Sequence, residues 1–333
     1  MILNSIFDAS PLRNEQAAYD HVEARIWPNG RVCPHCGVVD RSGKLENQRS
    51  KPSKLNPKGK LVLGFYKCYA CRKPFTVKVG TIFEDSHVPM HLWLQAIVMM
   101  CSSKKGISSN QLHRTLGVTL RTAWHMSHRI RLMMAPNTDV FAPLGGAGKI
   151  VEADETYIGK REEQRIEPWV LTQHGWHRRR TGPANKVPVV TLVERGCQAR
   201  SIKAESIDRE TLNKFLTLNI AHKSRLMTDE LPVYRNIGKR FADHESVRHS
   251  ADEYVRGEAH TNTVEGYFSI FKRGMKGIYQ HCDERHLHRY LAEFDFRYSN
   301  RVALGVDDGA RTARAVEGAV GKRLTYRTTR SQA

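Results

Sequence analysis

The stretch KIVEADETYIG, residues 149–159, decides the fold of the C-terminal half of the chain. We interpret it as a β-strand that opens a new domain, because residues 136–148 before it are rich in proline and glycine and form a linker. The segments KVPVVTLVER and GCQARSIKAES follow as a hairpin around Gly196. Helices and single strands then alternate as far as residue 300. This succession predicts a mixed α/β sheet.

The later elements of this domain each have a local signal. Asp208 is placed to cap a helix. RLMTDELPVY, residues 225–234, is interpreted as a short strand ending in an acid, and SVRHS, residues 246–250, as a further strand. The two helices expected after them are HTNTVEGYFSIFKRGMKG, residues 260–277, and HLHRYLAEFDFRYSNR, residues 286–301.

The composition indicates a globular protein with a polyanionic partner. The 333 residues suggest two or three domains. No apolar run is long enough to cross a bilayer, and the N-terminus lacks a secretory pattern, so we expect a cytoplasmic protein without a membrane partner. Lys and Arg outnumber Asp and Glu by 53 to 34, a formal net charge of +19. This excess favours nucleic acid as the partner, with an anionic membrane surface or simple solubility as the alternatives.

Four of the seven cysteines form two CxxC knuckles, in CPHC and CYAC. Two knuckles can supply four thiolates at tetrahedral angles around Zn²⁺, and four thiolates leave no open coordination position, so we expect a structural zinc ribbon. The alternative is a redox CxxC, which normally occurs only once. The predicted zinc ligands are Cys33, Cys36, Cys68 and Cys71. Cys101, Cys197 and Cys282 have no partner in the sequence and are expected to be ordinary buried residues.

A helical region follows the ribbon. KPFTVKVGTIF, residues 73–83, alternates as a strand that would close the ribbon, and the period becomes helical from Met90 to Met134. Three helices with a glycine-containing turn suggest a helix-turn-helix in which Thr119 caps the last helix. A plain three-helix bundle would give the same periodicity. Residues expected to face DNA are Arg121, His125, His128 and Arg129, and residues expected to pack include Leu120 and Trp124.

Three carboxylates lie on successive elements of the α/β domain: Asp154, Asp229 and Glu265. Each taken singly has an ordinary explanation as a cap, a turn acid or a surface charge. Their combination in a strongly basic chain suggests phosphoryl transfer, because carboxylates bind hard Mg²⁺.

Five segments match a known family: CPHCG, YKCYACRKPFTVKVGTIFEDS, VEADETYIG, LMTDELPVY and the long stretch from HSADEY to RYSNR. In these segments the chain resembles a bacterial insertion-sequence transposase of the ISXO-like kind. That family has an N-terminal zinc ribbon and a DDE catalytic domain. The resemblance implies an RNase H-like fold and makes Asp154, Asp229 and Glu265 the ligands of two Mg²⁺ or Mn²⁺ ions. In part of the family an asparagine takes the third position, and Asn262 stands close by. We prefer Glu265 because a charged carboxylate neutralises a cation better than a carboxamide.

Helical geometry explains the polar spacing of residues 260–277. At 100° per residue, Asn262, Glu265, Ser269 and Lys272 fall within about an 80° sector, while the apolar residues gather on the adjoining sector. The apolar side can dock on the sheet, the polar side can present a metal ligand and a phosphate-binding cation, and Gly274 is expected to end the helix. An amphipathic helix with a solvated pair is the competing explanation.

The resemblance implies cleavage at the element's terminal inverted repeats and transfer of the freed 3′ hydroxyl into target DNA. The working complex is expected to be a homo-oligomer associated with the nucleoid. Alternatives are a DNA-binding regulator derived from such a transposase, and an RNase H-type nuclease. The expected domains are 1–88 with the ribbon, 89–135 helical, 148–302 catalytic, and a basic tail over 303–333 with no placed element. The further basic residues expected on DNA are Arg178, Arg179, Arg180 and Arg273, although the arginine run would also suit a solvated loop.

Overall fold

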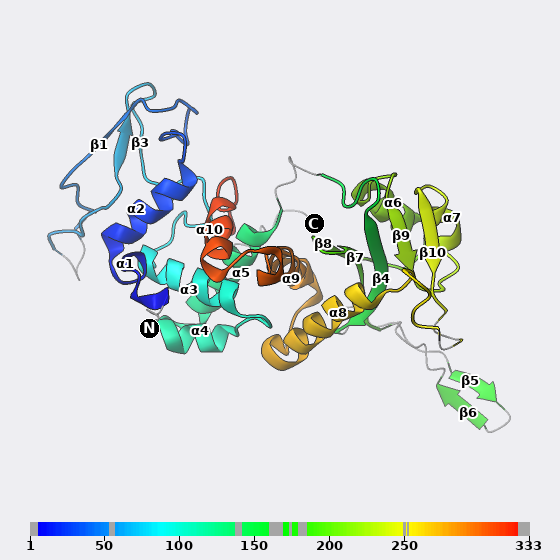
Figure 1. Ribbon diagram of the computed structural model, residues 1–333. Coiled ribbons are helices and arrows are strands. Elements are labelled where there is room, and N and C mark those ends of the chain that lie inside the picture. The colour runs from blue at the N-terminus through cyan, green and yellow to red at the C-terminus, as the bar shows by residue number, and fades with distance from the viewer. Residues whose placement is uncertain are drawn as a thin grey trace, which may run out of the picture. The chain divides into compact units, whose positions relative to one another are not determined.

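The computed structural model describes residues 6–52, 57–136, 142–159, 169–172, 175–178, 185–248, 251 and 253–325. The chain divides into two compact units (Figure 1). Unit 1 combines Met1–Ser103, Ile107–Ala135 and Val306–Ala333, and unit 2 combines Lys104–Gly106 with Pro136–Gly305. No helix among the described residues has both the length and the apolar character needed to cross a membrane.

The N-terminal part of unit 1 contains a three-stranded antiparallel sheet. It follows the 3-10 turn η1 (Ile6–Asp8) and two helices, α1 (Ser10–Arg13) and α2 (Glu15–Ile26). The strands are β1 (Ser42–Lys44), β2 (Tyr66–Cys68) and β3 (Pro74–Phe75).

The strand expected over residues 73–83 is wrong beyond Phe75. Consecutive turns replace it, and the Thr81 hydroxyl donates to the carbonyl of Lys78, which stabilises one of these turns. The alternating pattern reflects turns with buried side chains, since Val77, Ile82 and Phe83 are all buried.

Three helices follow: α3 (Met90–Ser102), α4 (Ser109–Leu116) and α5 (Leu120–Met134). The expected turn is present, because Gly117 ends α4 at φ 65°, a left-handed conformation that favours glycine. Thr119 accepts from the amide of Thr122 and caps α5, as predicted. Helix α3 is apolar on most sides and forms much of the core of unit 1.

The C-terminal residues complete unit 1. No element is expected there from the sequence, yet Asp308–Glu317 forms helix α10, capped by Asp307 and packed against α3 and α2. The buried guanidinium of Arg311 donates to the carbonyl of Cys101 at the end of α3. Residues 306–325 are therefore part of the folded unit rather than a basic tail.

Unit 2 contains the predicted mixed sheet, with strand order β10-β9-β4-β7-β8. Strands β4, β7 and β8 are antiparallel neighbours, and β9 and β10 run parallel to β4. This order and these directions define an RNase H-like fold. The strands are β4 (Ile150–Ile158), β7 (Val187–Glu194), β8 (Ala199–Lys203), β9 (Arg225–Thr228) and β10 (Asp243–Ser246).

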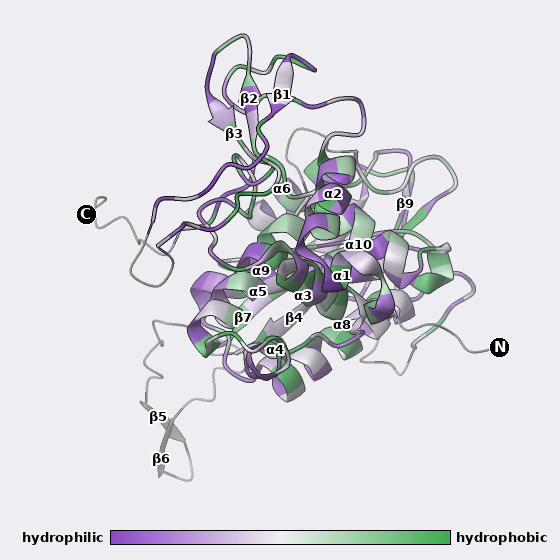
Figure 2. Ribbon diagram, turned by 90° about the vertical axis from the view of Figure 1, so that its left-hand side faces the viewer, coloured by the Kyte–Doolittle hydropathy of each residue, from purple (hydrophilic) through white to green (hydrophobic). Residues whose placement is uncertain are grey.

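Helices cover both faces of this sheet. One face packs on α6 (Arg209–Asn219) and α7 (Tyr234–Gly238), and the other on α8 (Asn262–Gly274) and α9 (Leu287–Ser299). Asp208 caps α6 as predicted. In Figure 2 hydrophobic and hydrophilic residues alternate along the helices, as expected where one helix side packs on a sheet. Further elements among the described residues are the hairpin β5 (Trp169–Thr172) and β6 (Gly175–Arg178), and the short helical turns η3 (Met275–Tyr279), η4 (Glu284–His286) and η5 (Val302–Leu304).

Two local predictions in unit 2 need correction. The last strand covers Asp243–Ser246, because its pairing with β9 starts at Asp243, and of the segment expected as a strand, residues 246–250, the last two lie outside the described residues. Gly274 is the last residue of α8, as expected, but it does not break the helical path, because the chain continues directly into the π-helical turn η3. Gly274 has an ordinary helical φ of −65°, and a Cβ there would lie 2.5 Å from Phe294 Cζ and 2.7 Å from the carbonyl oxygen of Lys105. The glycine is required by close packing.

Candidate functional site

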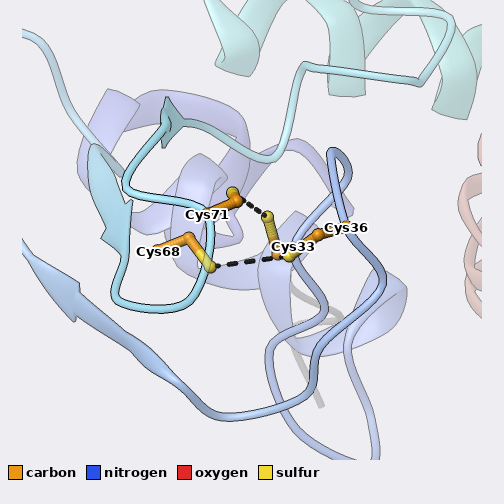
Figure 3. Close-up of side chains that lie close together, drawn as sticks. All are labelled: Cys33, Cys36, Cys68 and Cys71. Atoms are coloured by element: carbon orange, nitrogen blue, oxygen red, sulfur yellow. Dashed lines mark hydrogen bonds between the residues drawn. The ribbon is translucent and has the colours of Figure 1, made fainter.

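The four cysteines of the two knuckles converge in unit 1 (Figure 3). Their sulfur atoms all lie within 4.8 Å of one another. Cys33 Sγ lies 3.7 Å from Cys71 Sγ, and Cys36 Sγ lies 3.7 Å from Cys68 Sγ. The chain therefore brings together the sulfur set predicted from the sequence.

Backbone amides in both knuckles point at these sulfurs. The amide of Cys71, opposed by burial and helped by that of Ala70, lowers the pKa of Cys68 to about 7. The Val38 amide likewise lowers the pKa of Cys36, but burial and the other three thiols outweigh it and raise that pKa to about 11. Amides directed at sulfur favour thiolates, so the residues present fit a tetrahedral Zn²⁺.

A second cluster of ligand atoms lies in unit 2, where β4 and β9 run side by side. Their parallel register places Glu152 beside Met227, so Asp154 and Asp229 come at the same level two residues further on. Strand β9 ends at Thr228, whereas β4 continues to Ile158, so among the described residues no strand pairs with β4 on this side beyond Glu152. We call this stretch beside Asp154 the open edge. One carboxylate oxygen from each of Asp154, Glu155 and Asp229 lies within 4.8 Å of the others.

Asp154 and Glu155 approach this cluster from opposite faces of the sheet. Asp154 lies opposite Thr191 of the neighbouring strand β7, on the face of the sheet that α8 and α9 cover. Glu155 lies on the other face, where its carboxylate accepts a 2.8 Å hydrogen bond from the buried hydroxyl of Tyr234. Burial, followed by the negative charge of Asp229, raises the pKa of Glu155 to about 7 despite that hydrogen bond. The cluster thus spans the open edge.

The loop after β9 fixes the Asp229 side chain. The amide of Leu231 donates to Asp229 Oδ1 at 3.1 Å, and the hydroxyl of Thr228 donates to the carbonyl of Asp229. The Nε2 atom of His244, on β10, lies 2.9 Å from the hydroxyl oxygen of Thr228. These contacts hold the carboxylate next to the end of β4.

Glu265 and Asn262 both lie in the first turn of α8. Glu265 accepts a 2.9 Å hydrogen bond from the Thr261 hydroxyl and does not share the 4.8 Å grouping of Asp154, Glu155 and Asp229. Sequence reasoning therefore named two members of this carboxylate group and missed Glu155, although it directly follows Asp154 in the strand.

Glu152 is a second residue that sequence reasoning missed. It is fully buried on the α8 face of β4 and accepts hydrogen bonds from the amides of Thr263 and Val264 at 2.8 and 2.9 Å. It also pairs with Arg195 Nε at 2.6 Å. A carboxylate at a buried strand position was the available signal, because unpaired charges are rarely buried. Glu152 anchors the start of α8 beside Asp154.

The basic residues named from the sequence fall into different settings. Lys272 and Arg273 are both exposed near the end of α8, where the Arg273 guanidinium bonds to Ser269. Arg178 belongs to β6, but its side chain, together with Arg179 and Arg180, lies outside the described residues.

The residues named on helix α5 from the sequence differ in how exposed they are. Arg121 is exposed and His125 is half-buried. Arg129 and His128 are buried, and Arg129 donates to the carbonyls of Ile82 and Glu84 at 2.7 Å, so its guanidinium holds unit 1 together. Leu120, expected to pack, is exposed.

These features define a class of protein, the insertion-sequence transposases that combine a zinc ribbon with an RNase H-like domain. Residues 143–299 match the ISXO2-like transposase domain, and residues 13–74 match the transposase zinc-ribbon domain. The chain belongs to the ISXO2-like transposases.

Similar proteins also come from transposable elements. An uncharacterized protein in transposable element ISH50 of Halobacterium salinarum is 27% identical over 81% of this chain and 86% of its own length. The crystal structure of the Mos1 strand transfer complex is 14% identical, covers 64% of this chain and 76% of its own, and has a TM-score of 0.21. The crystal structure of the mariner Mos1 paired end complex with Mg is 14% identical in sequence, covers 63% of this chain and 77% of its own, and has a TM-score of 0.21. These two structures define no residue correspondence with this chain.

Proposed function

We propose that the chain is the active transposase of an insertion sequence, which binds the ends of its element and carries out cation-dependent DNA cleavage and strand transfer. The convergence of Asp154 and Asp229 at the open edge of the RNase H-like sheet carries this proposal. A regulator without catalysis would have no use for carboxylates gathered in this way, because their mutual repulsion is unfavourable without a cation.

The residues present suit a hard divalent cation, Mg²⁺ or Mn²⁺, because the cluster offers only carboxylate oxygens. Asp154 and Asp229 would hold it from neighbouring strands. Two bound ions would together activate the attacking hydroxyl and stabilise the departing 3′ oxygen. Glu265 is the proposed third ligand, because α8 starts on the face of β4 that carries Asp154. Asn262 is the alternative at this position.

Basic residues in three parts of the chain would bind DNA: the end of α8, unit 1, and the run at residues 178–180. Lys272 and Arg273 would neutralise phosphates near the reacting strand, since both are exposed beyond Glu265 on the same helix. In unit 1 the zinc ribbon and the exposed Arg121, with His125 beside it, would recognise the terminal inverted repeats. Arg178, Arg179 and Arg180 would add contacts to the DNA backbone.

Pairing two element ends requires more than one active site, so we propose that the working complex is a homo-oligomer. The net charge of +19 suits a protein that resides on the DNA of the nucleoid.

The test uses labelled duplexes taken from both ends of the element, a supercoiled target plasmid and purified protein. Joined products are expected with Mg²⁺ and are expected to disappear when Mg²⁺ is omitted. Asp154→Ala and Asp229→Ala should bind the ends and join none. End binding by the wild type without any cleavage or joining would support the regulator instead, and cleavage without joining would support a nuclease.

A further inference from the structure

Unit 2 contains a cavity of about 480 Å³ whose role the proposed catalytic cluster does not explain. It lies where the end of β4 meets the start of β7, the last turn of α8 and the turn η3. Its volume is within the range of small-ligand sites, which are concave and mostly apolar with a few polar groups.

The charged residues of the cavity are mainly cationic. Three lysines line it: Lys186 before β7, Lys272 in α8 and Lys276 in η3. All three are exposed, so their ammonium groups can approach a ligand from solvent. Among the described residues that line the cavity, Glu284 is the one carboxylate, and it pairs with Lys203 at 3.4 Å. The cavity therefore attracts an anion.

The floor of the cavity is apolar. Val187, Met275 and Leu287 line it and are 2%, 6% and 2% exposed, and Ile158 packs against the same core cluster. A phosphate alone would need the lysines but gains nothing from such a floor. A ligand with a flat apolar part and a phosphate group uses both, and a nucleotide has this composition.

The cavity lies further along the same strand and the same helix that carry Asp154 and Glu265. Ile158 follows Asp154 by four residues of β4, roughly 13 Å at the rise of a strand. Lys272 follows Glu265 by seven residues of α8, roughly 10 Å at the rise of a helix. One strand of duplex DNA advances about 3.4 Å along the helix axis per nucleotide. Measured along that axis, the cavity therefore lies roughly three to four nucleotides from a phosphate at the cluster.

We propose that this cavity holds one unpaired nucleotide of the element's terminal DNA, extruded from the duplex a few positions from the cleavage site. Its base rests on the apolar floor, and Lys186 and Lys276 bind the flanking phosphates. Extruding a base costs the energy of unpairing and unstacking, which these contacts offset. This inference rests on the proposed function, and it assigns a ligand to residues that the carboxylates do not touch.

The experiment uses end duplexes with 2-aminopurine in place of one base, moved through the nucleotides nearest the cleavage site. This base analogue fluoresces strongly when unstacked. The proteins are the wild type, the double variant Lys186→Glu/Lys276→Glu, and Lys239→Glu as the control. Lys239 is an exposed lysine at the end of α7, and the helix α7 covers the other face of the sheet. Matched unfolding curves establish that each variant folds.

A severalfold rise is expected at one position with the wild type and with Lys239→Glu, and no rise with the double variant, which should also join ends at least tenfold more slowly. If the wild type joins ends but no position brightens, or if the double variant brightens equally, the cavity does not hold a nucleotide. A rise seen only with labelled target duplex overturns the assignment to the element's end. If the wild type neither binds nor joins ends, the proposed function fails and this inference falls with it.

Discussion

The carboxylate of Glu152, in strand β4, accepts a 2.9 Å hydrogen bond from the backbone amide of Val264, in the first turn of helix α8. A negative charge at a helix N-terminus is favourable, and Glu152 satisfies amides that would otherwise have no partner in the helix. Glu152 and Asp154 point to the same face, two residues apart in one strand. The first turn of α8, with Asn262 and Glu265, is therefore fixed relative to Asp154.

Removing this anchor should uncouple the helix from the strand. Glu152→Ala leaves Arg195 without its buried partner, which typically costs about 3–5 kcal/mol of unfolding free energy. Glu152→Gln should cost less, because an amide oxygen still accepts from the helix, and should restore part of the strand transfer lost in Glu152→Ala. Urea unfolding and joining assays check both. The control is Glu245→Ala, whose ion pair with Arg225 is partly exposed, so its loss should lower the free energy of unfolding much less than the loss of Glu152. Equal losses for Glu152→Ala and Glu245→Ala would refute the anchor.

Glu155 should make the stability of unit 2 depend on pH. Its pKa is raised from 4.5 to about 7 in the folded state, mainly by burial, so the folded chain binds the proton more tightly. Stability should fall as the pH rises from about 4.5 to about 7, by at most about 3 kcal/mol. Glu155→Gln should therefore stabilise the protein at pH 8 without added divalent cations, and have little effect at pH 4.5. Thermal unfolding at both pH values measures this, and added Mg²⁺ should reduce the difference at pH 8. A gain of equal size at both pH values would contradict the burial of an ionised carboxylate.

Two glycines of α8 should respond oppositely to the same substitution. Gly274→Ala should destabilise by about 1–3 kcal/mol, because its Cβ would overlap Phe294 and the carbonyl of Lys105. Gly266→Ala places its Cβ in open space within the same helix and should stabilise by up to about 1 kcal/mol. Equilibrium unfolding of the two variants side by side checks the packing, and a stabilising Gly274→Ala would show that the helix does not pack there as described.

The cysteine cluster should bind one zinc ion per chain and stabilise unit 1. Cys68→Ser should lower the zinc content and weaken binding to the element's ends, because three thiolates hold the ribbon less firmly than four. Cys197→Ser, which alters a half-buried cysteine of unit 2, is the control and should keep the zinc. Metal analysis of both purified proteins decides the matter, and full zinc content in Cys68→Ser would exclude the four-sulfur site.

Local signals predicted many elements but not their partners. Thr119, Gly196 and Asp208 act through neighbours in sequence, so their cap and turn roles could be predicted directly. The meeting of Asp154 with Asp229 depends on parallel pairing between strands far apart in sequence, and only the family resemblance indicated it. No periodicity within either strand specifies that register.

Residues on helix α5 show why surface roles are hard to predict. The helix-turn-helix interpretation placed Arg129, together with His125, among the residues that face DNA. The Arg129 guanidinium is instead buried, where it donates hydrogen bonds to the carbonyls of Ile82, Glu84 and Leu324. These carbonyls belong to segments that are remote in sequence. Long-range packing also placed α10 in unit 1, where composition alone suggested a tail.

The most direct measurement of the central claim is strand transfer by Asp154→Cys with Mg²⁺ and with Mn²⁺. A thiolate is a soft ligand that suits Mg²⁺ poorly and Mn²⁺ somewhat better, so the substitution changes cation preference only where the side chain holds the cation. We predict no joining with Mg²⁺ and a partial return of joining with Mn²⁺, while end binding stays at the wild-type level. Wild-type joining by Asp154→Cys with Mg²⁺ would contradict the claim that this carboxylate holds the cation.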